Sequence, residues 1–328
     1  MELPQNILME RLLALLRASD EMMKSVFHHN RQGTLDMLAR SVKELLAAEA
    51  AAIFLVDEDS PDELVLSAYE LDKPVRLRKV RLKIQDVPHG GMTGYIAYTG
   101  EIIRLHGEEL RGHQNNAHSS TEHLISGVGF STLGIPLKDR KGRVLGIAKV
   151  DNKKGPDGAA CEEAFFDEVD EFVARILLNK IVLVLETLCN FDAIRTLMEA
   201  MRRAGKLEDL LDEILKTGVR LIGADRGDFV RWDEHRRQLV PAAQYGGEKP
   251  EHDQVWPERS VVDEVWRTQE SALISDVRSD PKYRDIYYEI QPSTRSEIAV
   301  CLVSEGKTVG VLNAESSKVD WFDAHDLE

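Results

Sequence analysis

The residues with the clearest chemical pattern are two polar pairs on either side of a phenylalanine. Asn152 and Lys153 are followed by twelve residues and then by Phe166, and three residues after Phe166 come Asp170 and Glu171. The first pair ends a predicted strand, and the second lies in the first turn of a long predicted helix. A lysine and an aspartate placed in this way can form an ion pair. The spacing therefore predicts that Lys153 binds Asp170 and ties the helix to the edge of the sheet.

Capping is the alternative role for the aspartate of this pattern. Asp167 has a residue type favoured at a helix N-cap, and Asp170 stands three residues later, where an acid completes the cap. The same F-D-x-x-D spacing recurs at 322–326 without the lysine. Glu171, taken alone, is typical of a solvated helix face.

A repeat shows how the chain is organised. Residues 133–152 (LGIPLKDRKGRVLGIAKVDN) recur as residues 298–316 (IAVCLVSEGKTVGVLNAES), about 165 residues later. Both copies have the pattern of a strand hairpin with a polar turn. A period of this length indicates two duplicated domains rather than short stacked repeats.

The second copy lacks the polar pattern. When Gly146 is aligned with Gly310, Ser316 and Ser317 stand where the first copy has its Asn-Lys pair. Leu327 stands where the first copy has its second acidic residue. Any function that depends on the pattern is therefore expected in the first copy alone.

The pattern N-K-x12-F-x3-D-E after a strand hairpin resembles the fingerprint of cyclic-nucleotide-binding GAF domains, the regulatory modules of phosphodiesterases and some adenylyl cyclases. The first half also carries the family-like segments GMTGYIAYTGE and FDEVDE, whereas the second half is similar to the general family and not to its cyclic-nucleotide branch. The resemblance implies an α+β fold with two GAF domains, each a central antiparallel β-sheet flanked by helices, joined by a long helical linker.

The expected boundaries follow from this resemblance. They are 1–33 for an N-terminal helix, 34–188 for the first GAF domain, 189–204 for the helical linker and 205–328 for the second GAF domain. The second domain stops before a helix equivalent to the one that closes the first. We therefore expect either a shortened chain or a parent protein that continues into an output domain.

The resemblance also implies ligand-binding positions in the first domain. Tyr69 falls where the family stacks an aromatic ring on a purine, and Glu70 follows it as an acceptor for a base N–H. Met92, Thr93 and Gly94 lie in a turn that opens a helix, whose free N–H groups suit a cyclic phosphate. The expected ribose or phosphate contacts are Ser126, Gly129 and Ser131. The expected ligand is cAMP or cGMP, with neither a metal nor a covalent cofactor.

Each of these positions also has an explanation that involves no ligand. Tyr69 also suits a cross-strand aromatic residue, and a glycine before a helix is common for conformational reasons alone. At the level of the whole chain, the alternative to a nucleotide sensor is a dimerisation and relay module. Its pocket would be empty or would hold another small molecule, because one fold can serve many ligands.

An apolar stripe predicts a homodimer. On the long helix that starts near residue 167, the apolar residues step by four and three, as in a coiled-coil seam. These residues are Leu177, Ile181, Val184, Leu188 and Phe191. An exposed seam of this kind is buried against a partner, so we expect two copies of the chain to pair.

The charge and the cysteines exclude several classes of function. A net charge of −15 and a pI near 5.2 argue against binding to nucleic acid or to an anionic membrane surface, since both require positive charge. No apolar run approaches the roughly 18 residues of a membrane-spanning helix. Three cysteines lie far apart without a C-x-x-C pair, which favours a reducing compartment and hence a cytoplasmic location.

Neither metal binding nor catalysis is predicted. His106, His113, His118 and His123 follow one another at intervals of seven, five and five, which match no compact metal motif, and solvated loop histidines are the alternative. No nucleophile, base and orienting group converge by spacing. GAF-type methionine sulfoxide reductases and bilin photoreceptors need cysteines at places where this chain has none. We therefore expect a regulatory protein that binds a small molecule.

Overall fold

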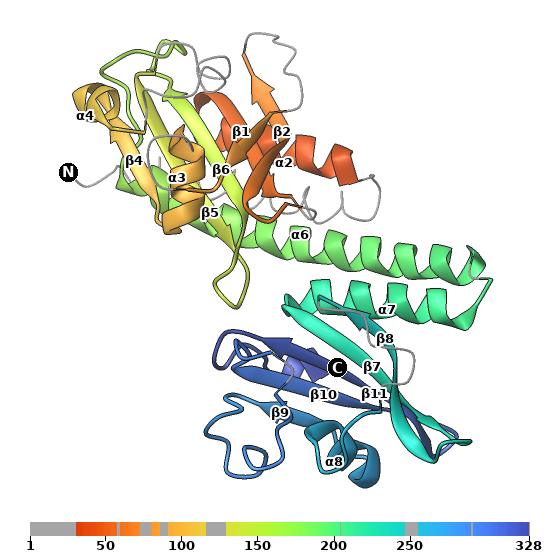
Figure 1. The fold of residues 1–328 in the computed structure, drawn as a ribbon. Helices are drawn as coiled ribbons and strands as arrows, with labels where there is room; N and C mark the ends of the chain where they lie inside the picture. The colour runs from red at the N-terminus through yellow and green to blue at the C-terminus, as the bar shows by residue number, and fades with distance from the viewer. Residues whose placement is uncertain are drawn as a thin grey trace. The chain divides into compact units, whose positions relative to one another are not determined.

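The structure is a computed structural model that describes residues 31–57, 60–72, 80–85, 91–115, 129–203, 205–246, 255–289 and 291–327. The predicted N-terminal helix up to residue 30 and the predicted contact Ser126 lie outside these residues. The chain divides into two compact units, residues 1–188 and 189–328 (Figure 1).

The first unit is built on a six-stranded antiparallel sheet. The strands are β1 (Ala48–Val56), β2 (Glu63–Leu71), β3 (Arg81–Lys83), β4 (Ile103–His106), β5 (Ser131–Lys138) and β6 (Val144–Lys153), in the spatial order β3-β2-β1-β6-β5-β4. The predicted hairpins are β1-β2 and β5-β6. Because β1 and β6 lie in the centre of the sheet, they are buried on both faces. A polar side chain on either strand is therefore enclosed by protein.

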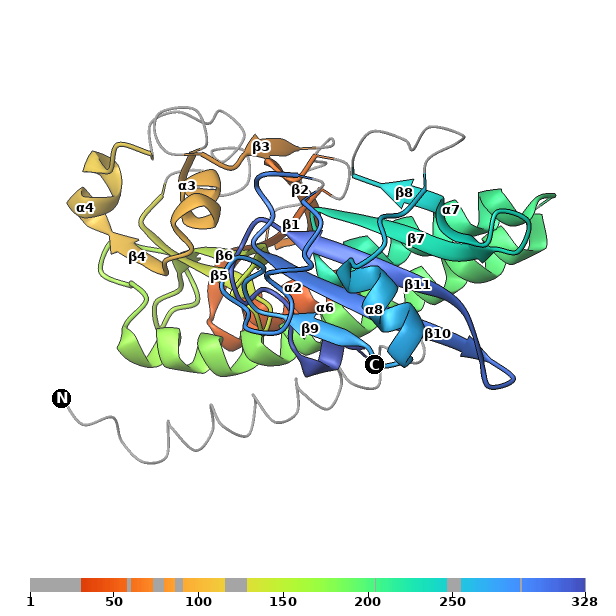
Figure 2. The ribbon, with the colours of Figure 1, turned by 60° about the horizontal axis from the view of Figure 1, so that its bottom comes forward.

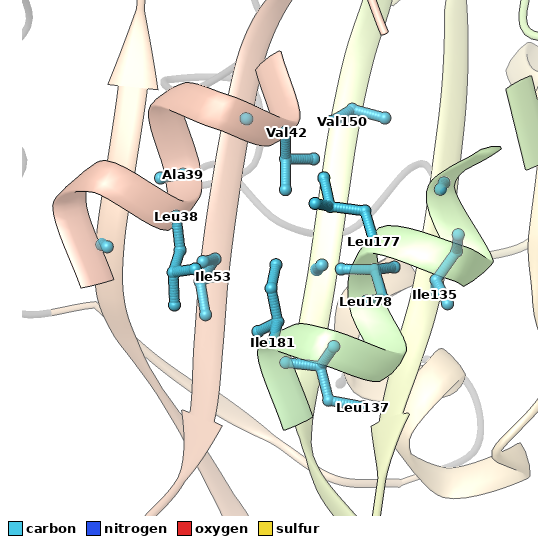
Figure 3. Close-up of a cluster of buried hydrophobic side chains, with 14 of the residues drawn as sticks. Leu38, Ala39, Val42, Ile53, Ile135, Leu137, Val150, Leu177, Leu178 and Ile181 are labelled. Atoms are coloured by element: carbon cyan, nitrogen blue, oxygen red, sulfur yellow. The ribbon is translucent and has the colours of Figure 1, made fainter. Parts of the chain in front are cut away.

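One face of this sheet, here called the outer face, is covered by α2 (Arg31–Leu45) and α6 (Glu168–Arg203). Figure 3 shows Leu38 of α2, Ile53 of β1 and Ile181 of α6 converging in this core. Apolar residues at i, i+3 and i+4 give each helix one stripe that packs against the apolar face of the strands.

The predicted dimer seam is wrong for four of its five residues. Leu177, Ile181, Val184 and Leu188 are buried in the core of the outer face, and only Phe191 is exposed. The reason is that a helix that packs on its own sheet has the same spacing of apolar residues as a helix in a coiled coil.

The opposite face, here called the inner face, is covered by α3 (Gly91–Thr99) and α4 (Gly107–Gly112) (Figure 2). Met92 and Ile96 of α3 and Leu110 of α4 pack on Ala52 and Phe54 of β1. The sequence predicts a long surface loop from residue 106 onward. The start of that segment is instead the helix α4, because Leu110 gives it an apolar anchor on the sheet.

The second unit repeats this plan with a five-stranded antiparallel sheet. The strands are β7 (Arg226–Asp233), β8 (Gln238–Tyr245), β9 (Ala272–Ile274), β10 (Ser296–Ser304) and β11 (Lys307–Ser316), in the order β8-β7-β11-β10-β9. Figure 1 shows α7 (Leu207–Ile222) and α8 (Val261–Thr268) on opposite sides of this sheet. A short 3-10 helix, Ala324–Leu327, follows. The face under α8 is the inner face of this unit, since α8 is the counterpart of α3.

The predicted fold class is confirmed in each unit, and α6 is the predicted long helix. It runs without interruption from Glu168 to Arg203. None of the helices in the described ranges has the length and apolar character needed to cross a membrane.

Candidate functional site

The predicted ion pair of the polar pattern is present in the first unit. The Nζ atom of Lys153 lies 2.5 Å from Oδ1 of Asp170, and both side chains are buried. The same Nζ atom lies 5.6 Å from the centre of the Phe166 ring, which belongs to the core of the outer face. The last residue of β6 is thereby fastened to the first turn of α6.

Asp170 also takes part in a cap. Its Oδ2 atom accepts a hydrogen bond from the backbone N–H of Asp167 at 3.0 Å, while Oδ1 of Asp167 accepts one from the N–H of Asp170 at 2.9 Å. Asp323 and Asp326 repeat one half of this exchange, because Oδ2 of Asp326 accepts from the N–H of Asp323 at 2.8 Å. Both units therefore have this cap, and in the first unit the capping aspartate also binds a lysine.

The other residues of the pattern hold loops and strand ends. Asn152 has a φ of 60°, its Oδ1 atom accepts from the N–H of Phe130 at 2.8 Å, and its amide donates to Glu49 at 2.8 Å. Glu171 accepts a hydrogen bond from Arg104 at 3.2 Å. The whole pattern thus links α6 and the end of β6 to β1, to β4 and to the residue that precedes β5.

The inner face carries a buried polar network that the sequence did not single out. The hydroxyl of Thr132 on β5 donates to Oδ1 of Asp151 on β6 at 2.7 Å, and Nζ of Lys149 lies 3.2 Å from Oδ2 of Asp151. All three side chains are buried. Strand alternation places them on this face, because Val150 between the two charged residues belongs to the outer core.

The floor around this network consists of small side chains. Ala50 and Ala52 of β1 pair with Asp151 and Lys149 across the sheet. Tyr69 of β2 pairs with Ala52, is half-buried and packs with the apolar cluster of the inner face. The network therefore lies between an aromatic ring at one side and α3 above.

The helix α3 is held close to the sheet by a glycine. A Cβ atom on Gly94 would overlap the backbone carbonyl of Lys83 on β3, so no larger residue fits without a shift. Met92 packs in the apolar cluster of the inner face, and Thr93 is completely buried. The structure thus brings Tyr69, Met92, Thr93 and Gly94 to one face, as the resemblance implies.

Glu70 and Ser131, which the resemblance also implies as ligand contacts, do not reach this face. Glu70 lies on the opposite face from Tyr69, since successive strand residues alternate, and its carboxylate is 3.7 Å from Arg40 of α2. Ser131 lies on the outer side, where its hydroxyl accepts from the N–H of Lys153 at 3.0 Å. Gly129 precedes β5 close to Leu110, where a Cβ atom would lie 3.3 Å from a methyl group of that leucine. We therefore leave Glu70 and Ser131 out of the candidate site.

Residues 147–152 (IAKVDN) contain a sequence pattern that could have indicated the charged residues of this network. Lys149 and Asp151 are two residues apart and follow the apolar residues 144–148 of the same strand, so they share one face of an enclosed strand. Charged side chains are almost never fully buried unless they are paired or functional. The sequence pattern could thus have indicated a polar site, but not its partner Thr132 on the neighbouring strand.

A further polar side chain is enclosed beyond α4. Asn115 is completely buried, and within the described part of the chain neither its Oδ1 nor its Nδ2 atom has a hydrogen-bond partner. His113 packs against Tyr95, with ring centres 5.7 Å apart, and His106 stacks on Phe165 at 4.3 Å. The rings of these two histidines therefore pack against aromatic rings, whereas the alternative drawn from the sequence was that they are solvated in a loop.

Among the described residues, neither a metal-binding group nor the cavity beside the loop between β6 and α6 coincides with the predicted ligand residues. The described residues include no group of three or more His, Cys, Asp or Glu side chains placed to hold a metal ion. A cavity of about 300 Å³ lies beside the loop between β6 and α6, lined in part by Lys153, Lys154 and Cys161. It is lined by none of the predicted ligand residues.

Comparisons with known families decide the identity of both units. A sequence profile described as GAF domain matches residues 30–183, and a second profile with the same description matches residues 205–328. The chain consists of two GAF domains in tandem. GAF domains are sensor and regulatory modules of signalling proteins, and the long helix α6 runs between the two that are present here.

Two solved structures are similar to parts of the chain. The GAF domain of an Acinetobacter phosphoenolpyruvate-protein phosphotransferase is 21% identical, over 53% of this chain and 92% of its own, with a TM-score of 0.42. A free methionine-R-sulfoxide reductase from Neisseria meningitidis, solved with its substrate, is 23% identical over 43% of this chain and 81% of its own, with a TM-score of 0.37. No curated protein matches the chain significantly. Similarities this low carry no information about the ligand.

Proposed function

We propose that this chain is the sensor region of a signalling protein, in which the inner face of the first GAF domain binds a cyclic nucleotide and α6 relays the bound state. The observation that carries the proposal is the buried network of Thr132, Lys149 and Asp151 beneath α3. Burying a lysine and an aspartate is costly, and a hydrophobic pair of similar volume is often as stable. A ligand that uses these charges explains why they are kept.

Each part of a cyclic nucleotide has a matching group on this face. The ring of Tyr69 offers an apolar surface for a purine, next to the flat floor of Ala50 and Ala52. The ammonium group of Lys149 and the N–H groups in the first turn of α3, at Met92 and Thr93, suit the cyclic phosphate. Thr132 and Asp151 then supply an acceptor for a ribose hydroxyl or a base N–H.

We further propose a non-catalytic role in the cytoplasm. Cys161, Cys189 and Cys301 are all unbridged, which suits a reducing compartment. The strong negative charge of the chain supports the exclusion of nucleic acid and of anionic membrane surfaces as partners.

The second candidate function is a dimerisation and relay module without a nucleotide. It is supported by the exposed residues Phe191, Ile194, Met198 and Met201 of α6, which step by three, four and three along the helix. This spacing is that of a coiled-coil seam, and it lies beyond the part of α6 that packs on the first sheet. Dimerisation through this stripe is also compatible with a nucleotide sensor, so ligand binding, and not pairing, distinguishes the two candidate functions.

A thermal-shift comparison with cAMP and cGMP tests the proposed site. The full chain is compared with Lys149→Gln and with Lys138→Gln, which removes a lysine from the exposed end of β5 and serves as the matched control. We expect one nucleotide to raise the melting temperature of the wild type and of the control, and not that of Lys149→Gln. Tyr69→Leu, which leaves every charge in place, should weaken the shift as well.

Two outcomes would contradict the proposal in different ways. Equal shifts for the wild type, Lys149→Gln and Tyr69→Leu would place the nucleotide elsewhere. No shift of the wild type at millimolar concentrations of either nucleotide would leave the relay module as the function.

A further inference from the structure

The inner face of the second GAF domain holds a cluster of buried charged and polar side chains, although this domain lacks the sequence pattern of the first. Its members are Arg226 and Asp228 of β7, Glu297 of β10, and Asn313 and Glu315 of β11. Strand alternation and register bring them together, since β11 pairs with both β7 and β10. Each of the five side chains is at most 3% exposed.

These residues occupy the same sheet positions as the candidate site of the first domain. The register Arg226–Glu315 and Asp228–Asn313 corresponds to Ala50–Asp151 and Ala52–Lys149. Glu297 stands at the place of Thr132. The first domain thus combines one lysine with one aspartate, whereas the second sets three carboxyl groups against a single guanidinium group. The two inner faces have the same strand register, but their charges differ, so they would select ligands of different charge.

The charges of the cluster do not balance within the protein. Arg226 binds Asp228 with 2.7 Å between Nη2 and Oδ2, while its Nε atom is 3.9 Å from Glu315. Thr294 donates a hydrogen bond to Oε2 of Glu315 at 2.7 Å. Oε2 of Glu297 is buried without a hydrogen-bond partner among the described residues.

Asn313 points to the same imbalance. Its side-chain oxygen is also buried without a hydrogen-bond partner in the described ranges, although its amide lies 3.5 Å from Glu315. Unpartnered buried acceptors are rare in native proteins, and each lacks the hydrogen bond that would offset its desolvation. Nε of Arg226 is likewise buried without a hydrogen-bond partner among the described residues, so charge as well as unpartnered atoms must support a ligand. Three carboxyl groups around one guanidinium group, with two unpartnered acceptors, favour a further hydrogen-bond donor that carries positive charge.

The protonation of the cluster agrees with this interpretation. Burial, and then the charges of Glu315 and Asp228, raise the pKa of Glu297 well above its ordinary value, against the opposing effect of Arg226. Burial likewise raises the pKa of Glu315 and of Asp228.

One further group faces the cluster from the loop before β10. Burial, with the charges of Glu315, Glu297 and Glu289, raises the pKa of the Tyr287 hydroxyl. The raised pKa values favour the protonated carboxyl groups, whereas a bound cation would favour the ionised carboxylates.

We propose that the inner face of the second GAF domain binds a small organic cation through an ammonium or guanidinium group. The N–H groups of such a ligand would donate to Oε2 of Glu297 and to Oδ1 of Asn313, and its charge would balance the carboxylates. A metal ion is the poorer occupant, because in the described part of the chain no three acidic, histidine or cysteine side chains converge on one point. The proposal is independent of the nucleotide site in the first domain.

Tryptophan fluorescence provides a selective readout, because all four tryptophans, at positions 232, 256, 266 and 321, lie in the second domain. The full chain is titrated with agmatine and with putrescine, with the uncharged 1,4-butanediol as the control for shape. Separate titrations with magnesium and calcium chloride test the metal. We expect one of the two amines to give a saturable change, and the diol and the metals to give none.

Charge-neutral variants assign the response to the cluster. Glu297→Gln keeps the shape of the side chain and should weaken amine binding by about tenfold or more, since a hydrogen bond to a charged group is lost. Glu305→Gln removes a carboxylate from the exposed turn between β10 and β11 and should bind like the wild type. Calorimetry in buffers of different ionisation enthalpy should show proton release when the amine binds, with affinity rising with pH.

Several results would overturn the proposal. These are no response of the wild type to either amine at millimolar concentrations, an equal response to the diol, saturation by a metal ion instead of an amine, and unchanged amine binding by Glu297→Gln. Binding without proton release would also count against the part assigned to Glu297.

Discussion

Asp170 uses its two carboxylate oxygens for different purposes. Oδ1 binds the ammonium group of Lys153, and Oδ2 accepts the backbone N–H of Asp167 at the start of α6. The cap alone would order the first turn of the helix, as it does at Asp323 and Asp326. The lysine adds a fixed link from that turn to β6, the strand that also carries Lys149 and Asp151 on its inner face. A movement of β6 on ligand binding would thus be passed directly to α6.

Removing either partner of this link should destabilise the first domain. We expect Lys153→Ala and Asp170→Ala each to lower its free energy of unfolding by about 3 kcal/mol, because one buried group loses its partner. The double variant should be no worse than the worse single variant. Urea unfolding followed by circular dichroism measures these values. Arg175→Ala, which breaks an exposed ion pair with Glu171, is the control and should cost less than about 1 kcal/mol.

Losses that add up in the double variant would show that Lys153 and Asp170 act separately. Nucleotide affinity gives a second readout for the same variants. If the link only stabilises the fold, the affinity of the folded fraction stays unchanged. If it couples the inner face to α6, affinity falls by more than the loss of folded protein explains.

The buried cluster of the second domain should make its stability depend on pH. The pKa of Glu297 is raised above its ordinary value of 4.5, so above that pH the unfolded chain has released a proton that the folded domain still holds. Stability therefore falls as pH rises from the ordinary pKa toward the raised one. We expect Glu297→Gln to flatten this decline and to be more stable than the wild type at the alkaline end. Urea unfolding followed by tryptophan fluorescence measures it, and an equal slope for both proteins would contradict it.

At the residue level, the sequence predicted contacts that depend on order along the chain. Lys153 and Asp170 could be paired because a strand end and the next helix start must lie close together. Glu70 could not be excluded, since its orientation depends on the register of β2, which has a bulge near its middle. Thr132 was missed because its partner Asp151 lies on another strand, and no spacing within one segment reports on that contact.

Among the elements, α3 depends most closely on one residue. Gly94→Ala would place a methyl group against the backbone carbonyl of Lys83, so α3 must move away from β3. We expect a loss of about 2 kcal/mol in the stability of the first domain, together with weaker nucleotide binding, as overpacking forces a backbone shift. Gly112→Ala at the end of α4 meets nothing within 4 Å and should be nearly neutral. Calorimetric melting compares the two variants, and equal stability would contradict the tight approach of α3.

One part of the helix α6 packs on the first sheet, and a later part has exposed apolar residues. Up to Leu188 its apolar stripe packs on the first sheet, whereas Phe191, Ile194, Met198 and Met201 are exposed. We expect this second stripe to pair two chains, and Ile194→Lys with Met198→Lys to yield monomers. Light scattering measures the mass. A wild type with a mass near 37.0 kDa at micromolar concentration would contradict the homodimer, and the exposed change Glu199→Lys is the control.

From the sequence, the presence of helices and hairpins could be predicted better than the surfaces against which they pack. Hairpins and helices follow from local periodicity, so the repeated hairpins β5-β6 and β10-β11 could be foreseen. The dimer seam could not be told from a core stripe, because both have the same spacing. The short helix α4 depends on a single apolar anchor, Leu110, and two of its six residues are glycine, which favours a loop prediction.

For the whole molecule, duplication has produced one framework with two different inner faces. The resemblance of the chain to a known family predicted the framework, and the loss of the sequence pattern in the second copy left open whether this domain binds a ligand. Its buried charged cluster indicates that the pattern concerns the link between the end of β6, a central strand, and α6, while the inner face varies independently. Two sensors of different ligands in one chain would allow the response to one to depend on the other.

Isothermal titration calorimetry of the full chain with cAMP and with cGMP tests the central claim most directly. The account predicts saturable binding of one nucleotide per chain, with a stabilisation of the first domain of about 2.7 kcal/mol at a concentration one hundred times the Kd. The tryptophan fluorescence of the second domain reports whether that domain responds as well. The absence of binding heat for both nucleotides at millimolar concentration would contradict the account, as would two equivalent nucleotides per chain.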